Sequence, residues 1–167
     1  MIKTLLKQEL YAQYVRGLVA NLLLSKKLKL AAAESCTGGM ISAACTDLAG
    51  SSVWFERGFV TYSNEAKTEL LGVETSLLHR FGAVSEPVVR AMVVGALNRS
   101  HAQVAVAVTG VAGPTGGTAE KPVGTVWFGF AVPGQVVTEI KHFDGDRGQV
   151  RTATVQHVFA RLVELLE

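Results

Sequence analysis

Residues 103–117 read QVAVAVTGVAGPTGG, an apolar segment that passes directly into a loop rich in glycine. The segment 103–108 is too apolar for a strand with one face in water, so it predicts a strand that is buried on both faces. Strands of this kind occur in sheets that helices cover on both sides. We therefore expect an α/β fold with three layers, α/β/α, around a mixed, mainly parallel sheet.

The patterns on either side of this strand favour the same architecture. Apolar residues at helical spacing, together with helix-start signals, predict helices over 3–25, 40–48 and 64–71, a further helix that starts near 85–87, and a last one that starts near 145–147. Short apolar or β-branched runs predict strands over 28–33 and 53–62. Pro133-Gly134 between the runs 123–132 and 136–143 predicts a late antiparallel hairpin.

Composition limits the classes of protein that fit. The 167 residues, of which 49% are hydrophobic and 18% charged, predict a single ordered domain over 1–167. A net charge of +2 gives no sign of a nucleic-acid or acidic-membrane surface. No apolar run is long enough to span a membrane, and the N-terminus lacks the pattern of a signal peptide, so we expect a cytoplasmic protein.

Cysteine and histidine spacing indicates neither a disulfide nor a metal site. Cys36 and Cys45 fall in what reads as one helix, which places them too far apart for a disulfide. The four histidines show no metal-ligand spacing with one another or with cysteine, so we expect no metal.

Three loops can carry chemistry, because each follows a predicted strand. The first is ESCTGG at 34–39, which also begins a helix. Ser35 there can act as a nucleophile beside free backbone N–H groups, with Gly38 and Gly39 allowing close approach of a substrate. The alternatives are that Ser35 only caps the helix, or that Cys36 is the nucleophile rather than a small buried residue.

The second loop is YSNEAK at 62–67. If Asn64 caps the following helix, Lys67 lies in its first turn, where the helix dipole disfavours a protonated amine. The dipole contributes only ~0.3–1 kcal/mol at an exposed end, so burial would have to contribute most of what a lysine base needs. The alternative is an exposed Lys67 paired with Glu65 or Glu69.

The third loop is TGVAGPTGG at 109–117, whose four glycines suggest backbone N–H groups turned toward an anion. It is not a Walker A loop, because no Gly-Lys-Ser/Thr follows. The alternative is a flexible turn. Arg147, in the segment Gly-Asp-Arg at 145–147, is a candidate partner for the same anion, and Arg151 lies one helical turn further on.

Taken together, these segments resemble the CinA C-terminal domain family, whose characterised enzymes are nicotinamide-nucleotide amidases. The resemblance covers about residues 5–165, and this chain looks like a stand-alone version. It rests on motifs that occur in the order of the family: ESCTGG at 34–39, GSS at 50–52, YSNEAK at 62–67, LLGV at 70–73, GAVSE at 82–86, TGVAGPTGG at 109–117 and KPVGTV at 121–126.

The resemblance implies hydrolysis of the amide of nicotinamide mononucleotide, with Ser35 as nucleophile assisted by Tyr62 and Lys67, and with no cofactor or metal. It also implies a homodimer that binds a pyridine nucleotide, while the composition leads us to expect a cytoplasmic protein that binds neither nucleic acid nor membrane. A silent nucleotide-binding or regulatory module of the same fold is the alternative. The expected substrate-binding residues follow the nucleophile or come from the glycine loop and the last helix: Cys36, Thr37, Gly38, Gly39, Thr109, Gly110, Gly113, Gly116, Gly117 and Arg147.

Overall fold

The computed structural model describes residues 2–167. Its helices and strands follow one another in the expected order, with a short 3-10 helix and one further α-helix added. They are α1 (Ile2–Ser25), β1 (Leu30–Glu34), α2 (Met40–Thr46), η1 (Ser51–Val53), β2 (Phe55–Val60), α3 (Asn64–Leu71), α4 (Thr75–Phe81), α5 (Glu86–Asn98), β3 (Val104–Gly110), β4 (Thr125–Val132), β5 (Gln135–His142) and α6 (Arg147–Leu166).

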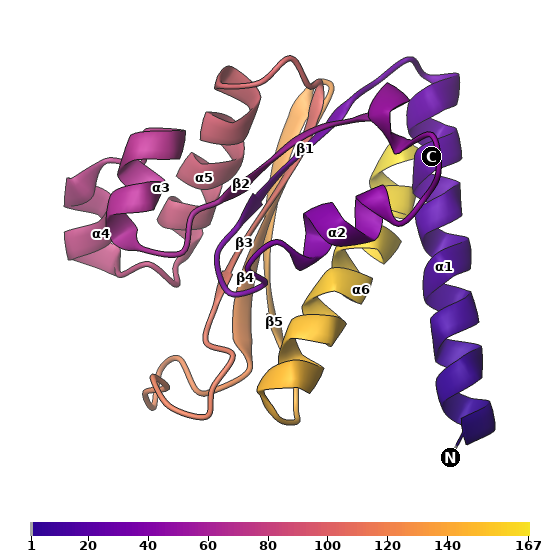
Figure 1. Ribbon diagram of the computed structural model, residues 1–167. Coiled ribbons are helices and arrows are strands. Elements are labelled where there is room, and N and C mark those ends of the chain that lie inside the picture. The colour runs from indigo at the N-terminus through magenta and orange to yellow at the C-terminus, as the bar shows by residue number, and fades with distance from the viewer. Residues whose placement is uncertain (1) are drawn as a thin grey trace.

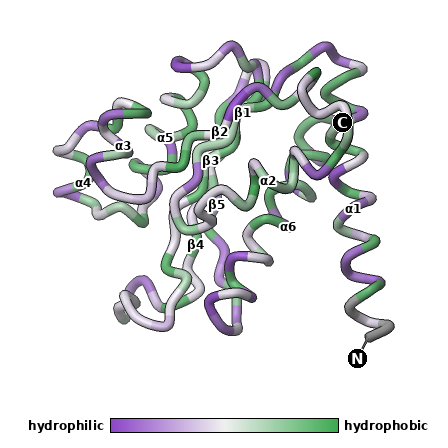
Figure 2. Tube along the Cα trace, viewed as in Figure 1, coloured by the Kyte–Doolittle hydropathy of each residue, from purple (hydrophilic) through white to green (hydrophobic). Residues whose placement is uncertain are grey.

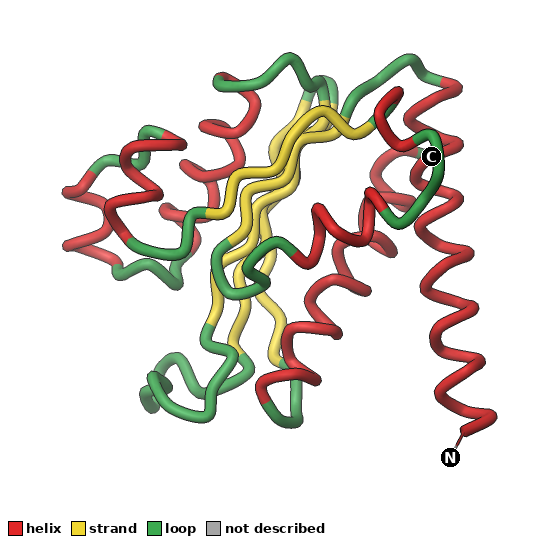
Figure 3. Tube along the Cα trace, in the orientation of Figure 1, coloured by secondary structure: helices red, strands yellow, loops and turns green. Residues whose placement is uncertain are grey.

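The five strands form one mixed sheet in the order β2-β1-β3-β4-β5 (Figure 3). β1 pairs in parallel with both β2 and β3, whereas β3–β4 and β4–β5 are antiparallel. β1 and β3 are buried along nearly their whole length, as their unbroken apolar runs predict. The sheet therefore places three parallel strands side by side, with their carboxyl ends at one edge.

Helices cover both faces of the sheet and give the expected three layers (Figure 1). On one face, α1, α2 and α6 bury a cluster that includes Leu23, Ile41 and Leu162 against the sheet. On the other face, α3, α4 and α5 bury Leu71, Leu78 and Met92. Figure 2 shows hydrophobic residues along the central strands and a hydrophilic turn before α6. Among the described residues, no helix is long and apolar enough to cross a membrane.

Three local predictions were wrong. Ser63, not Asn64, caps α3, because the Ser63 hydroxyl accepts from the Ala66 N–H at 3.0 Å. Cys36 is not helical, because α2 begins only at Met40, after Gly39 at a left-handed φ of 102°. The helix α4 was not predicted; it is short, and Glu74 before its first residue makes no side-chain capping bond.

Candidate active site

The three predicted loops meet at the carboxyl ends of β1, β2 and β3. In the sheet register, Glu34 at the end of β1 lies opposite Val60 on one side and Val108 on the other. The Thr61 N–H donates to the Glu34 carbonyl at 2.8 Å, and the Ser35 N–H donates to the Val108 carbonyl at 3.2 Å. Parallel pairing therefore brings together three loops that are far apart in the sequence.

Ser35 and Lys67 form the central contact of this site. Lys67 Nζ lies 3.1 Å from Ser35 Oγ, and both side chains are buried, with 1% of Lys67 and 8% of Ser35 exposed. Nζ also donates to the backbone carbonyls of Thr61 at 2.9 Å and Tyr62 at 3.1 Å, with a longer contact of 3.4 Å to Ser63. The exposed, ion-paired Lys67 weighed as an alternative is therefore wrong.

Burial is the main cause that lowers the pKa of Lys67 below its usual value, and the negative charge of Glu65 opposes this shift only in part. A neutral amine has two N–H groups and one lone pair. Two N–H groups match the two nearest carbonyls, and the lone pair then faces Ser35 Oγ. This arrangement can take a proton from the hydroxyl.

Ser35 does not cap α2, so the alternative in which Ser35 is only a helix cap is wrong. The start of this helix is held instead by Glu34, whose side chain is fully buried. One carboxylate oxygen accepts from the N–H groups of Gly39 and Ile41, and the other accepts from the N–H of Ser42 at 2.8 Å. The hydroxyls of Thr37 and Ser42 add bonds of 2.6 and 2.8 Å. Glu34 thus leaves the Ser35 hydroxyl free for Lys67.

Sequence reasoning missed this function of Glu34, although one signal was present. A carboxylate directly follows the apolar run LAAA, where a charge is costly unless it is fully hydrogen-bonded. The same reasoning expected free N–H groups at the start of α2, and those of Gly39, Ile41 and Ser42 are in fact occupied by Glu34.

The backbone just after Ser35 does offer free donors. Within the described chain, the N–H groups of Cys36 and Thr37 donate to no other residue, whereas the Gly38 N–H donates to the Ser35 carbonyl at 3.1 Å. The side chain of Thr37 is turned to Glu34, and Cys36 lines the pocket. The N–H groups of Cys36 and Thr37 are thus available to hold an oxyanion, and that of Gly38 is not.

Cys36 is a poor rival nucleophile in this geometry. Burial raises the pKa of the Cys36 thiol to about 11. The reactive form of cysteine is the thiolate, which burial disfavours. The side chain is nearly inaccessible to solvent and belongs to the apolar cluster on the α2 face of the sheet. This fits the reading of Cys36 as a small buried residue.

Tyr62 and Arg147 contact each other and line the same pocket as Ser35 and Lys67. The Tyr62 hydroxyl accepts from Arg147 Nη2 at 3.1 Å, and Arg147 Nη1 donates to the Gly113 carbonyl at 2.9 Å. Tyr62 contacts Lys67 through its backbone carbonyl. The phenol is therefore joined to the arginine rather than to the amine.

The glycine loop contributes unevenly to the site. Thr109 and Gly110 line the pocket, and Gly113 contacts Arg147 through its carbonyl. Gly116 and Gly117 are not among the lining residues, and a Cβ on Gly117 would lie 2.7 Å from the Val123 N. Gly117 therefore permits close packing of two loop segments.

A pocket of about 210 Å3 collects these groups. Four further residues line it without having been predicted, and two of them, Ala83 and Val84, lie in the segment GAVSE. That segment supported the family resemblance, but Ala83 and Val84 suggested no role because their side chains carry no reactive group. The complete lining is Ser35, Cys36, Tyr62, Asn64, Lys67, Ala83, Val84, Thr109, Gly110, Ala112 and Arg147.

Arg151 does not line this pocket. Its guanidinium donates to the carbonyls of Cys36, at 3.1 Å, and Thr37, at 2.9 Å. Within residues 2–167, no group of three or more His, Cys, Asp or Glu side chains is placed to hold a metal ion.

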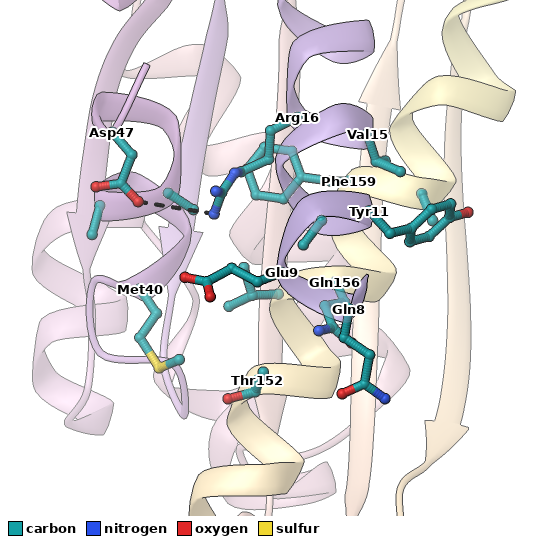
Figure 4. Close-up of a pocket in the computed structure, with 15 residues that line it drawn as sticks. Gln8, Glu9, Tyr11, Val15, Arg16, Met40, Asp47, Thr152, Gln156 and Phe159 are labelled. Atoms are coloured by element: carbon teal, nitrogen blue, oxygen red, sulfur yellow. Dashed lines mark ion pairs between the residues drawn. The ribbon is translucent and has the colours of Figure 1, made fainter. Parts of the chain in front are cut away.

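A larger cavity of about 560 Å3 lies between α1, α2 and α6 and holds none of the predicted catalytic residues. Figure 4 shows Val15 and Phe159 in its apolar lining, with the ion pair of Arg16 and Asp47 near Met40. None of its lining residues pairs a nucleophile with a base, so the smaller pocket is the candidate site for the chemistry.

Comparison with known proteins finds one family over most of the chain. The model of the CinA C-terminal domain family matches residues 12–166. A protein of Enterobacter agglomerans named nicotinamide-nucleotide amidohydrolase PncC is 64% identical over 120 residues, which cover 71% of this chain and 73% of that protein. The protein of the same name from Escherichia coli K12 is 50% identical over 145 residues, covering 86% and 88%.

A solved structure shows the same fold. The crystal structure of the competence/damage inducible protein CihA from Agrobacterium tumefaciens superimposes with a TM-score of 0.90 at 44% identity, covering 93% of this chain and 96% of that one.

Proposed function

This chain belongs to the CinA C-terminal domain family, and we propose that it hydrolyses the carboxamide of nicotinamide mononucleotide to nicotinic acid mononucleotide and ammonia. The observation that carries the proposal is the buried contact between Lys67 Nζ and Ser35 Oγ at 3.1 Å. The names of the two closely similar proteins support this substrate.

In the first step, Ser35 Oγ attacks the carboxamide carbon while Lys67 takes the hydroxyl proton. An amide is a poor electrophile and requires such an activated nucleophile. We assign the negative charge that develops on the carboxamide oxygen to the N–H groups of Cys36 and Thr37, which donate to no other described residue. Removing one such donor typically costs ~10²–10³ in rate.

In the second step, the tetrahedral intermediate collapses and the C–N bond breaks. Lys67 returns its proton to the departing nitrogen, which leaves as ammonia, and an ester to Ser35 remains. Water then attacks this ester with Lys67 as base, releasing the carboxylic acid and restoring the Ser35 hydroxyl. One general acid–base group is sufficient for both steps.

Arg147 and the glycine loop are the groups we assign to the phosphate. Arg147 lines the pocket and has a guanidinium that can form charge-assisted hydrogen bonds with a phosphate. The N–H group of Gly113 has no backbone acceptor within the described residues, and Gly113 has a positive φ of 81°. Backbone donors and one arginine can hold a single phosphate without a basic surface.

The test measures ammonia release from nicotinamide, its riboside and its mononucleotide under one set of conditions. We expect turnover of the mononucleotide and a far lower kcat/KM for the two phosphate-free compounds. Equal kcat/KM for all three would reject the assignment of the phosphate. No ammonia from the mononucleotide, with stabilisation of the protein by the same compound, would instead support the alternative of a silent nucleotide-binding module.

A further inference from the structure

The Arg151 side chain forms two hydrogen bonds with the turn at Cys36 and Thr37, directly after the proposed nucleophile Ser35. From α6, its Nε donates to the Cys36 carbonyl and its Nη2 to the Thr37 carbonyl, at 3.1 and 2.9 Å. These carbonyls lie 115 and 114 positions away in the sequence. No other side chain among those described donates to either carbonyl. The contact therefore acts on the backbone that we assign to the oxyanion.

A trans peptide unit is planar, and its C=O and N–H point in opposite directions. When Arg151 holds the Cys36 carbonyl, it also turns the Thr37 N–H to the opposite side of the turn. When it holds the Thr37 carbonyl, it fixes the plane that carries the Gly38 N–H, which donates to the Ser35 carbonyl at 3.1 Å. That bond in turn fixes the peptide that carries the Cys36 N–H.

We infer that Arg151 is a positioning residue that orients the N–H groups of Cys36 and Thr37 toward the oxyanion of the reaction. The inference rests on the proposed function and adds to it a residue that touches neither substrate nor nucleophile. Glu34 supports the same turn from the other side, since its carboxylate accepts from the Thr37 hydroxyl at 2.6 Å. Oriented donors stabilise the transition state more than the ground state, so their loss lowers kcat rather than binding.

The experiment compares Arg151→Ala and Arg151→Lys with the wild type and with Arg161→Ala, a variant of the same helix whose side chain pairs with Glu139 and Glu164. Two rates are measured: turnover of nicotinamide mononucleotide, and acylation of Ser35 by p-nitrophenyl acetate, followed by intact mass. The second reaction also passes through an oxyanion but does not require the natural substrate.

We expect Arg151→Ala to lose about 10²-fold in kcat and in the rate of acylation, with KM changed by no more than about threefold. Millimolar guanidinium ion is expected to restore part of kcat in Arg151→Ala, because it can occupy the vacated site, and to have no such effect in the wild type. Arg151→Lys should lie between the two, since an ammonium is a point donor without the planar fork of arginine. Arg161→Ala should keep the wild-type rates.

Wild-type rates in Arg151→Ala would overturn this inference and leave the proposed function standing. A raised KM with unchanged kcat would also overturn it, because Arg151 would then be a ligand of the substrate. A third contrary result is a loss of kcat in Arg151→Ala and Arg151→Lys that parallels a loss of folded protein and that guanidinium ion does not restore. If wild-type Ser35 is acylated but the mononucleotide is not hydrolysed, the proposed substrate fails, and the acylation rates still decide the inference. If wild-type Ser35 is not acylated, the proposed nucleophile and the inference fail together.

Discussion

Lys67 Nζ lies 3.1 Å from Ser35 Oγ, although 32 positions separate the two residues in the chain. Ser35 follows β1 and Lys67 lies in α3, which follows β2, so the parallel pairing of these strands creates the contact. A serine–lysine pair formed in this way depends on the sheet rather than on a local motif. The predictions below test that pair and the groups around it.

Ser35→Ala is expected to lower kcat for ammonia release by at least about 10⁴-fold, since removal of a nucleophile leaves only binding and electrostatic contributions. The hydroxyl has no capping function in α2, so the thermal midpoint should change little. Activity is measured by ammonia release and folding by circular dichroism. Wild-type kcat in this variant would remove Ser35 from the mechanism.

Lys67→Met is expected to abolish turnover to a similar extent while filling the buried space of the side chain. The wild-type kcat/KM should rise with pH, because only the neutral amine can accept the Ser35 proton. As burial lowers the pKa of Lys67, this rise should occur below the usual range of lysine. The pH–rate profile tests both statements, and a profile that falls with pH over this range would contradict the role of a base.

Glu34→Ala is expected to destabilise the protein by about 2–4 kcal/mol, because it leaves two buried donors, the Thr37 hydroxyl and the Ile41 N–H, and three partly buried ones without an acceptor. Chemical denaturation gives the free energy of unfolding. Glu69→Ala, at an exposed position on α3, serves as the control and should change it by less than about 0.5 kcal/mol. Equal stability of the two variants would show that the carboxylate does not anchor α2.

Tyr62→Phe separates a proton relay from a structural role. The phenol bonds to Arg147 and not to Lys67, so we expect kcat to be nearly retained. Arg147→Ala should instead reduce kcat/KM for the mononucleotide by about 10–100-fold, the value of a hydrogen bond to a charged group, and leave the riboside unaffected. A large loss of kcat in Tyr62→Phe, with KM unchanged, would instead show that the phenol takes part in proton transfer.

The homodimer implied by the family resemblance remains a prediction. The first half of α1 exposes Leu6, Leu10, Tyr11 and Tyr14, with between 53% and 66% of each residue accessible. An exposed apolar stripe of this kind favours association. Light scattering after gel filtration should give twice the chain mass, and Leu10→Glu combined with Tyr14→Glu should give the monomer. A wild-type monomer would contradict the expectation.

The sequence alone determined most of the helices and strands, and it pointed to the three loops that form the candidate site. Periods of two and of 3.6 residues, with turns at glycine and proline, are local properties that short segments encode. They predicted the strand at 103–108 and the break at ESCTGG, and position after a strand made Ser35 and Lys67 candidates. Prediction failed at α4 and at the cap of α3, because the sequence carries only weak signals for the start of these two helices.

The tertiary structure alone decided which groups meet. Register placed Ser35 against Lys67, and the buried end of β1 turned Glu34 into the anchor of α2. The packing of α6 directed Arg147 to Tyr62 and Arg151 to the Cys36 carbonyl, although the two arginines are only one helical turn apart. Such partners depend on distances between segments that are remote in the chain, and these distances are set by strand pairing and core packing.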